Sequence, residues 1–87
     1  MKVKLSDGFE VTVNENILED WRFLKLLRKV DKGESGLIVD IAEMLLGGEE
    51  EVDKLAEHFE KDGKQPSEDI INAITEIITS VGELKNS

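Results

Sequence analysis

The stretch that decides the fold is MKVKLSDGFEVTV, residues 1–13. Apolar and polar side chains alternate on both sides of a central polar turn, which is the pattern of two half-buried strands. A two-residue turn would pair Leu5 with Glu10 and place the apolar residues of the two strands on opposite faces. A three-residue loop with a left-handed Gly8 pairs Leu5 with Phe9 instead. The sequence therefore predicts a β-hairpin with one wholly apolar face.

Helical spacing replaces this alternation after the hairpin, because apolar residues now recur three and four positions apart. Asn16 and Glu19 are spaced as a capping box, which favours a helix that starts just after Asn16. The glycine pair 47–48 would end a second helix. The expected helices cover about residues 17–31, 36–46, 49–62 and 67–82. We therefore expect a single domain, residues 1–87, of the α+β class and mainly α, with the hairpin packed on a bundle of four helices.

Charge is unevenly distributed along this acidic chain, whose net charge is −9 at pH 7. Residues 1–48 carry 9 acids and 7 bases, whereas residues 49–87 carry 11 acids and 4 bases and so supply −7 of the total. Such a field repels phosphate groups and anionic lipids, which argues against binding to nucleic acid or to a membrane surface. The sequence shows no cysteine, no signal peptide and no apolar run of membrane-spanning length, which is compatible with the cytoplasm.

Residues that could carry out chemistry are few. Residues 31–43 resemble a calcium-binding loop, but the third position is Gly33 and the twelfth is Ala42, and neither supplies a side-chain oxygen. His58 is the only histidine, and no nucleophile motif accompanies it. The acidic clusters stand where helices are expected to start, and negative charge there complements the helix dipole. We therefore expect no enzymatic activity, no metal site and no cofactor.

Interface residues are sought on the first predicted helix, because its apolar side chains cover more than one narrow stripe. Trp21 has the largest apolar area and is expected in the core on the same side as Ile17. The other side of this helix presents Phe23, Leu26 and Val30. These three residues would form an exposed apolar patch, which is the candidate protein-binding site. Broadly apolar helices also favour self-association into a homo-oligomer.

Four segments give the chain a resemblance to a known family. They are KLSDGFEVTVN at residues 4–14, NENILEDW at 14–21, AEMLLGG at 42–48 and INAITEII at 71–78. In order and apolar character the segments resemble the short tail assembly chaperones of long-tailed phages and prophages of Gram-positive bacteria. The resemblance covers nearly the full chain, and it brings no invariant chemical motif from which a contact residue could be carried over.

The resemblance implies a non-enzymatic protein of the infected bacterial cytoplasm. Such a protein binds the long tape measure protein, and the tail tube protein, while the tail is assembled, and it is absent from the mature virion. Two other classes of protein remain compatible with the residues. An acidic inhibitor or antitoxin-like module would use the charge of residues 49–87 to mask a basic partner. A structural tail or head completion protein would instead be found in purified particles.

Overall fold

The computed structural model describes residues 1–86, and for residues 35 and 83–86 it describes the backbone alone. Helices predominate in this part of the chain, and one antiparallel hairpin precedes them, which confirms the α+β, mainly α class. The elements are, in chain order, β1 (Lys2–Lys4), β2 (Glu10–Thr12), the 3₁₀ turn η1 (Glu15–Glu19), α1 (Trp21–Asp31), the 3₁₀ turn η2 (Ser35–Leu37), α2 (Ile38–Leu46), α3 (Glu49–Phe59) and α4 (Ser67–Asn86).

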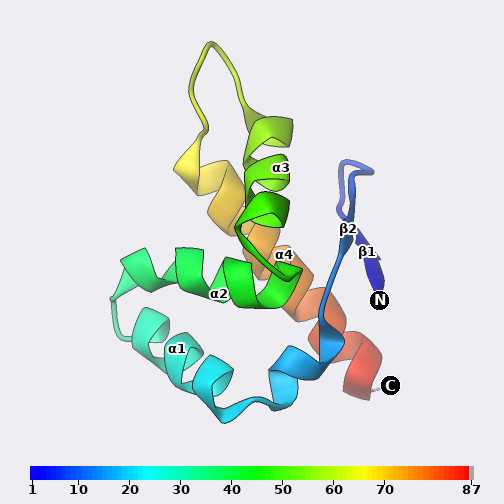
Figure 1. Ribbon diagram of the computed structural model, residues 1–87, viewed down its shortest axis with the longest axis vertical. Helices are drawn as coiled ribbons and strands as arrows, with labels where there is room; N and C mark the ends of the chain where they lie inside the picture. The colour runs from blue at the N-terminus through cyan, green and yellow to red at the C-terminus, as the bar shows by residue number, and fades with distance from the viewer. Residues whose placement is uncertain (87) are drawn as a thin grey trace.

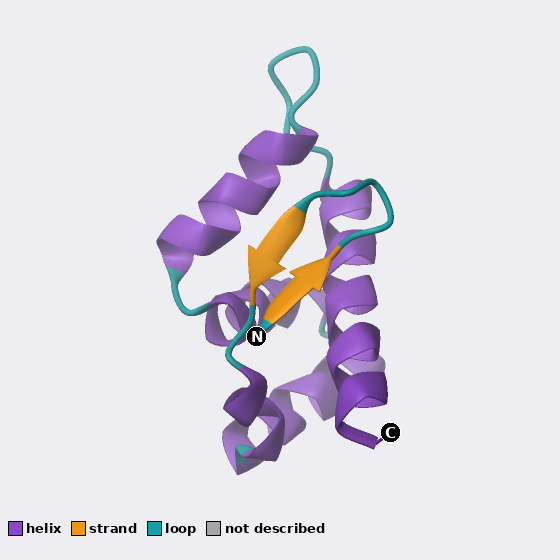
Figure 2. Ribbon diagram, turned by 90° about the vertical axis from the view of Figure 1, so that its right-hand side faces the viewer, coloured by secondary structure: helices purple, strands orange, loops and turns teal. Residues whose placement is uncertain are grey.

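Each helix packs on its neighbours in the chain (Figure 1). α1 lies against α2, α2 against α3, and α3 against α4. α4 then passes behind α3 and one end of α2 in this view. The hairpin lies beside α3 and α4 (Figure 2), and β1 contacts α4. The first strand and the last helix of the sequence therefore meet in the fold.

The hairpin has the register predicted from the sequence. Val3 lies opposite Val11 in the antiparallel pair, and the Leu5 N–H donates to the Phe9 carbonyl at 2.8 Å. Gly8 has a φ of +96°, the left-handed conformation that the three-residue loop requires. Because side chains alternate across a strand, this register gathers the apolar residues on one face, and that face closes over the helices.

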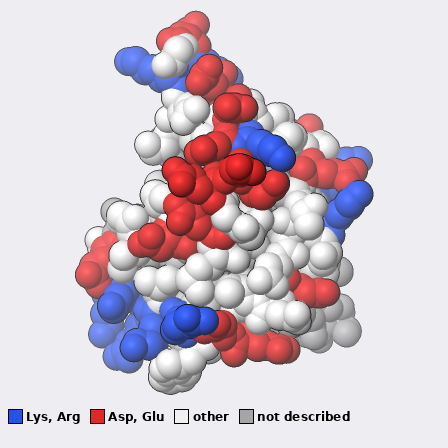
Figure 3. All heavy atoms as spheres, viewed as in Figure 1, with Lys and Arg blue, Asp and Glu red and all other residues white. Residues whose placement is uncertain are grey.

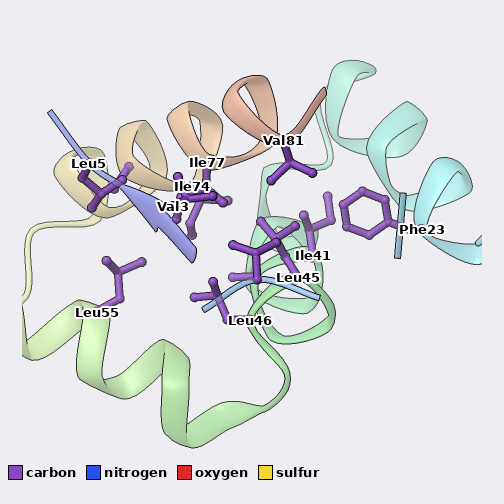
Figure 4. Packing of buried hydrophobic residues seen from close by; sticks show 13 residues of the cluster. Val3, Leu5, Phe23, Ile41, Leu45, Leu46, Leu55, Ile74, Ile77 and Val81 are labelled. Atoms are coloured by element: carbon purple, nitrogen blue, oxygen red, sulfur yellow. The ribbon is translucent and has the colours of Figure 1, made fainter. Parts of the chain in front are cut away.

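One hydrophobic core joins the hairpin to the helices (Figure 4). Its buried residues are Val3, Leu5 and Val13 from the hairpin segment, Phe23 from α1, Ile41, Ala42, Leu45 and Leu46 from α2, Leu55 from α3, and Ala73, Ile74, Ile77 and Val81 from α4. α2 and α4 supply most of these side chains, so they form the scaffold on which the other elements pack. Removal of this apolar surface from water is the main stabilising force in a chain without cysteine.

The first α-helix begins four residues later than the sequence predicts. The chain forms the 3₁₀ turn η1 where the helix was expected to start. Asp20 then takes an extended conformation, with φ −81° and ψ +125°. Its carboxylate accepts a hydrogen bond from the Arg22 N–H at 2.8 Å. Asp20 is therefore the residue that caps α1.

The predicted capping box of Asn16 and Glu19 is wrong, because both residues lie inside the 3₁₀ turn and not at the start of an α-helix. The chain is fixed just before this turn, where the Asn14 N–H donates to the Leu45 carbonyl at 2.9 Å. This bond ties the connection from the hairpin to the end of α2. The tight turn then redirects the chain, and α1 begins at Trp21 with the direction that packs it on α2.

α3 ends at Phe59, three residues before the predicted end. The reason is a tight turn that follows it, in which Asp62 and Gly63 have φ values of +52° and +77°. Lys61 and Lys64 exchange two backbone hydrogen bonds across this turn, of 2.8 and 2.9 Å. Positive φ at both central residues is the type I′ geometry, and a helix cannot continue through it.

The other helix boundaries are closer to the prediction. α1 ends at Asp31 and α2 at Leu46, both as expected. η2 takes the place of the first predicted residues of α2. α4 begins at Ser67 as expected and extends to Asn86, four residues past the predicted end. All the predicted helices are thus confirmed, and each has one boundary that differs from the prediction.

Candidate protein-binding groove

α1 turns a regular apolar stripe toward the core. The stripe consists of Phe23, Leu26, Leu27 and Val30, at the i, i+3, i+4 and i+7 positions of one helix face. Phe23 is fully buried, and the other three residues are half-buried against the core. Trp21 lies on the opposite face of the helix, where 72% of its surface is exposed.

The predicted patch of Phe23, Leu26 and Val30 therefore needs a correction. Phe23 belongs to the core and cannot contact a partner of the folded protein, whereas Trp21, which was expected in the core, lies outside. The physical reason is the late start of α1. The prediction takes the side of Ile17 as the core side of one continuous helix, but Ile17 belongs to η1 and does not share the rotation of α1. Leu26 and Val30 keep part of their surface open.

Positive charge collects on the outer face of α1 and just after it. Residues 21–32 contain five bases and one acid, which gives this segment a net charge of +4, and the rest of the chain carries −13. The five bases are Arg22, Lys25, Arg28, Lys29 and Lys32. Figure 3 shows blue atoms gathered over α1 and red atoms gathered over α3. An acidic protein thus has one basic face.

A groove of about 610 Å³ lies between α1 and the elements on one side of it. Its lining residues are Ile17 from η1, Arg22, Lys25, Leu26 and Lys29 from α1, and Met44 from α2. The three apolar residues are half-buried and form the floor, whereas the three cationic residues are exposed and form the rim. We name this site the α1 groove. Leu26 is the predicted interface residue that lines it, and Phe23 and Val30 are not among the lining residues.

One of the three rim cations is paired. The Arg22 Nη2 atom lies 3.0 Å from the Asp20 Oδ2 atom. The hydrogen bond from the Arg22 side chain, and next that from its backbone N–H, lower the pKa of Asp20, while the Asp20 carboxylate raises the pKa of Arg22. Lys25 and Lys29 take part in none of the ion pairs found among the described residues. Their ammonium groups are therefore open to a negatively charged partner.

A second hollow, of about 330 Å³, lies where α2, α3 and α4 meet. Val39 and Ile71 line it and are 52% and 36% exposed. The charge in its lining comes from Asp53, on the acidic helix α3. This hollow offers no cationic rim and is a separate surface from the α1 groove.

His58, the only histidine, holds the hairpin on α3. Its Nε2 atom lies 2.7 Å from the Asp7 Oδ2 atom in the hairpin loop, and its ring stacks on Phe9 with ring centres 4.0 Å apart. Beside this contact, the Ser6 N–H donates to the Glu76 Oε1 atom of α4 at 2.7 Å. The surroundings of His58 thus give it a packing role at the tip of the hairpin.

Comparison with known proteins identified no relative: no family model matches the chain, no curated protein is significantly similar, and no solved structure is significantly similar. Among the residues whose side chains the structure describes, 1–34 and 36–82, no three His, Asp or Glu are grouped so that they could hold a metal ion. None of the helices described has the length and apolar character needed to cross a bilayer.

The cationic rim is the part of the site that the sequence prediction misses. A charge summed over halves of the chain hides the +4 of residues 21–32, because the first half has a net charge of −2. The signal that could have found it is the spacing of Arg22, Lys25 and Lys29. These residues stand at i, i+3 and i+7, which puts three cations on one side of a helix.

Proposed function

We propose that this protein is a non-enzymatic binding protein that acts as a tail assembly chaperone of a long-tailed phage or prophage. The observation that carries the binding role is the α1 groove, whose apolar floor stays open to solvent between cationic side chains. A hollow with an apolar floor and a few placed polar groups is typical of binding sites. The family is supported by the resemblance of the four sequence segments given above.

The proposed client is the tape measure protein, together with the tail tube protein that polymerises around it. A chaperone has to cover apolar side chains of an unassembled protein and release them to the final partner. The α1 groove suits this task because its half-buried floor offers only a limited apolar area. The free energy gained by covering this area is reduced by the entropic and desolvation costs of association, so the client would be held weakly enough to be released. The charge of −13 outside residues 21–32 would keep the complex soluble. This assignment places the protein in the cytoplasm of the infected bacterium and outside the mature virion.

The test is co-expression of the chain with the tape measure and tail tube proteins encoded nearest to it, with co-purification and client solubility as readouts. We expect the wild-type protein to retain and solubilise the tape measure protein. Met44→Glu places a charge in the groove floor and should abolish retention. Val39→Glu is the matched control, because it places the same charge on an exposed apolar residue of the other hollow, and it should keep the client.

Failure of the wild-type protein to retain either client would overturn the chaperone proposal. If both variants lost the client while circular dichroism showed both to be folded, binding of the client would not be specific to the α1 groove. Detection of the chain in purified particles would instead support a structural tail or head completion protein.

A second candidate function is an acidic inhibitor or antitoxin-like protein, and the red surface over α3 in Figure 3 favours it. Three consecutive glutamates, Glu49 to Glu51, open that helix. A module of this kind would hold a basic partner mainly through charge, so moderate salt would release the partner. A complex that survives moderate salt and depends on Met44 would favour the chaperone.

A further inference from the structure

We propose that the α1 groove receives an amphipathic helix whose apolar stripe is flanked by acidic side chains. The inference rests on the proposed function, because the client of the chaperone would supply this helix. It adds the chemistry of the client segment that binds, which the family resemblance does not specify.

The floor of the groove suits a helical occupant. Ile17, Leu26 and Met44 come from three different elements, and each is half-buried, so each offers part of its apolar surface to the groove. A helix with apolar residues at i, i+3, i+4 and i+7 lays a stripe of this kind into an apolar groove. The inner face of α1 packs by the same spacing, with Phe23 and Leu27 against the core.

The rim determines the charge of the bound helix. Lys25 and Lys29 are four residues apart on α1, so they lie one helical turn from each other on the same side. Arg22 extends this row, and its guanidinium is held by Asp20 at 3.0 Å. Carboxylates one turn apart on a partner helix would face Lys25 and Lys29. An acidic flank is therefore complementary to this rim, and a basic flank would be repelled.

The small extent of the positive area favours a peptide over a nucleic acid or a membrane. α1 has 11 residues, which corresponds to a length of roughly 16 Å. A helix of similar length fits within this area. A duplex or a lipid surface would extend beyond it and would meet the −13 carried by the rest of the chain. Figure 3 shows the acidic side chains of α3 on the same side of the molecule as the bases of α1.

Trp21 provides a fluorescence signal close to the rim of the α1 groove, although it is not one of the lining residues. It is the only tryptophan, it is 72% exposed, and it lies one turn before Lys25 on the same side of α1. The probes are two synthetic helical peptides of about four turns, free of tryptophan, with leucines at i, i+3, i+4 and i+7. Glutamates flank the leucines in one peptide and lysines in the other. We expect isothermal titration calorimetry to show saturable binding of the glutamate peptide and no binding of the lysine peptide, and the glutamate peptide to shift the Trp21 emission to shorter wavelength.

Charge reversal at the rim should make the protein prefer the lysine peptide over the glutamate peptide. In the Lys25→Glu/Lys29→Glu variant, the dissociation constant for the glutamate peptide should rise about tenfold or more, and the lysine peptide should bind. Both positions are exposed, so the variant should fold as the wild-type protein does. Lys61→Glu/Lys64→Glu is the matched control, because it changes the net charge equally in the turn between α3 and α4. It should leave the preference unchanged.

Several outcomes would overturn the inference. Equal binding of both peptides, or equal loss in the rim variant and the control, would indicate a general effect of charge. An emission shift with vesicles of phosphatidylglycerol but not with the glutamate peptide would assign the surface to lipid. A shift that appears on raising the protein concentration alone would assign it to a second copy of the chain.

Co-purification separates this inference from the proposed function. If the wild-type protein retains the tape measure protein but does not bind the glutamate peptide, the proposed function stands and the acidic-helix inference fails. If the glutamate peptide binds selectively but no client is retained, the inference about the groove stands and the chaperone proposal fails.

Discussion

The Asp7 Oδ2 atom in the hairpin loop lies 2.7 Å from the His58 Nε2 atom on α3, although 51 residues separate the two in the chain. The same Asp7 side chain accepts a hydrogen bond from the Phe9 N–H at 3.0 Å, and Phe9 stacks on the His58 ring. One carboxylate therefore joins the hairpin turn to the helices. Because a carboxylate can be protonated, this junction depends on pH.

Acid should weaken the fold in part through this junction. The hydrogen bond from His58, and next that from the Phe9 N–H, hold the pKa of Asp7 below its ordinary value of 3.8. A carboxyl group with a lowered pKa in the folded state stabilises the fold above its ordinary pKa, and this contribution is lost as the pH falls through the folded-state pKa. We expect the free energy of unfolding to decrease between about pH 5 and about pH 2, and to decrease less in Asp7→Asn.

Urea unfolding at a series of pH values measures this difference. Asp53→Asn is the control, because Asp53 is exposed on α3 and takes part in none of the ion pairs found among the described residues. If Asp7→Asn and Asp53→Asn kept the same pH dependence as the wild-type protein, the contact with His58 would contribute nothing measurable.

Phe23 and Trp21 should differ sharply in their effect on stability. Phe23→Ala empties a fully buried position and should cost about 3–5 kcal/mol. That is a large share of the roughly 5–15 kcal/mol that stabilises a typical domain. Trp21→Ala removes a side chain that is mostly in water and should change stability by no more than about 0.5 kcal/mol. Urea denaturation compares them, with Phe23→Leu as a milder core variant, and the reverse ranking would mean that α1 is rotated relative to the core.

The cap of α1 should be found at Asp20 and not at Asn16. Asp20→Ala removes the acceptor of the Arg22 N–H, so the midpoint of thermal unfolding should fall by several degrees. Asp20→Asn should recover most of the loss, because an amide oxygen still accepts this bond. Asn16→Ala should leave the midpoint near that of the wild-type protein. A larger loss at Asn16 in scanning calorimetry would restore the capping box.

Two glycines should respond to alanine with opposite signs. Gly82 lies in α4 with open space around the position of an added Cβ, so Gly82→Ala should stabilise the fold by about 0.5–1 kcal/mol. Gly47 ends α2 with a φ of +90°, and Gly47→Ala should cost about 1–2 kcal/mol because an L-residue is strained there. Chemical denaturation of both variants measures the signs. A stabilising Gly47→Ala would contradict the left-handed end of α2.

The two Asp-Gly pairs of the sequence show how far local patterns predict this fold. At residues 7–8 the flanking strands must bury one face, which excludes the two-residue turn and leads to the three-residue loop that is found. At residues 62–63 the same dipeptide forms the two-residue turn, with both φ values positive. No alternation of apolar residues surrounds the second pair. The sequence therefore predicts a polar turn there but not the early end of α3.

The predicted rotation of α1 is wrong because it extends one helix back to Ile17, whereas the chain forms η1 there and α1 begins at Trp21. The bond between Asn14 and Leu45 joins residues 31 positions apart and fixes where the chain turns before α1. The predicted site carries this error. The prediction puts Phe23 on the exposed face of α1 and Trp21 in the core, whereas the structure has them the other way round, and the prediction does not include the cationic rim. Leu26 is the residue that both the sequence and the structure place in the candidate site.

The packing of β1 on α4 bears on the order in which the newly made chain folds. Contacts between successive helices join segments close in sequence, so they can form soon after each helix leaves the ribosome. The bond from Ser6 to Glu76 spans 70 residues, and closing so long a loop is entropically costly before the helices have formed. The hairpin is synthesised before these helices, and its contact with α4 should form last, so the part of its apolar face that α4 covers stays in contact with water until α4 has left the ribosome.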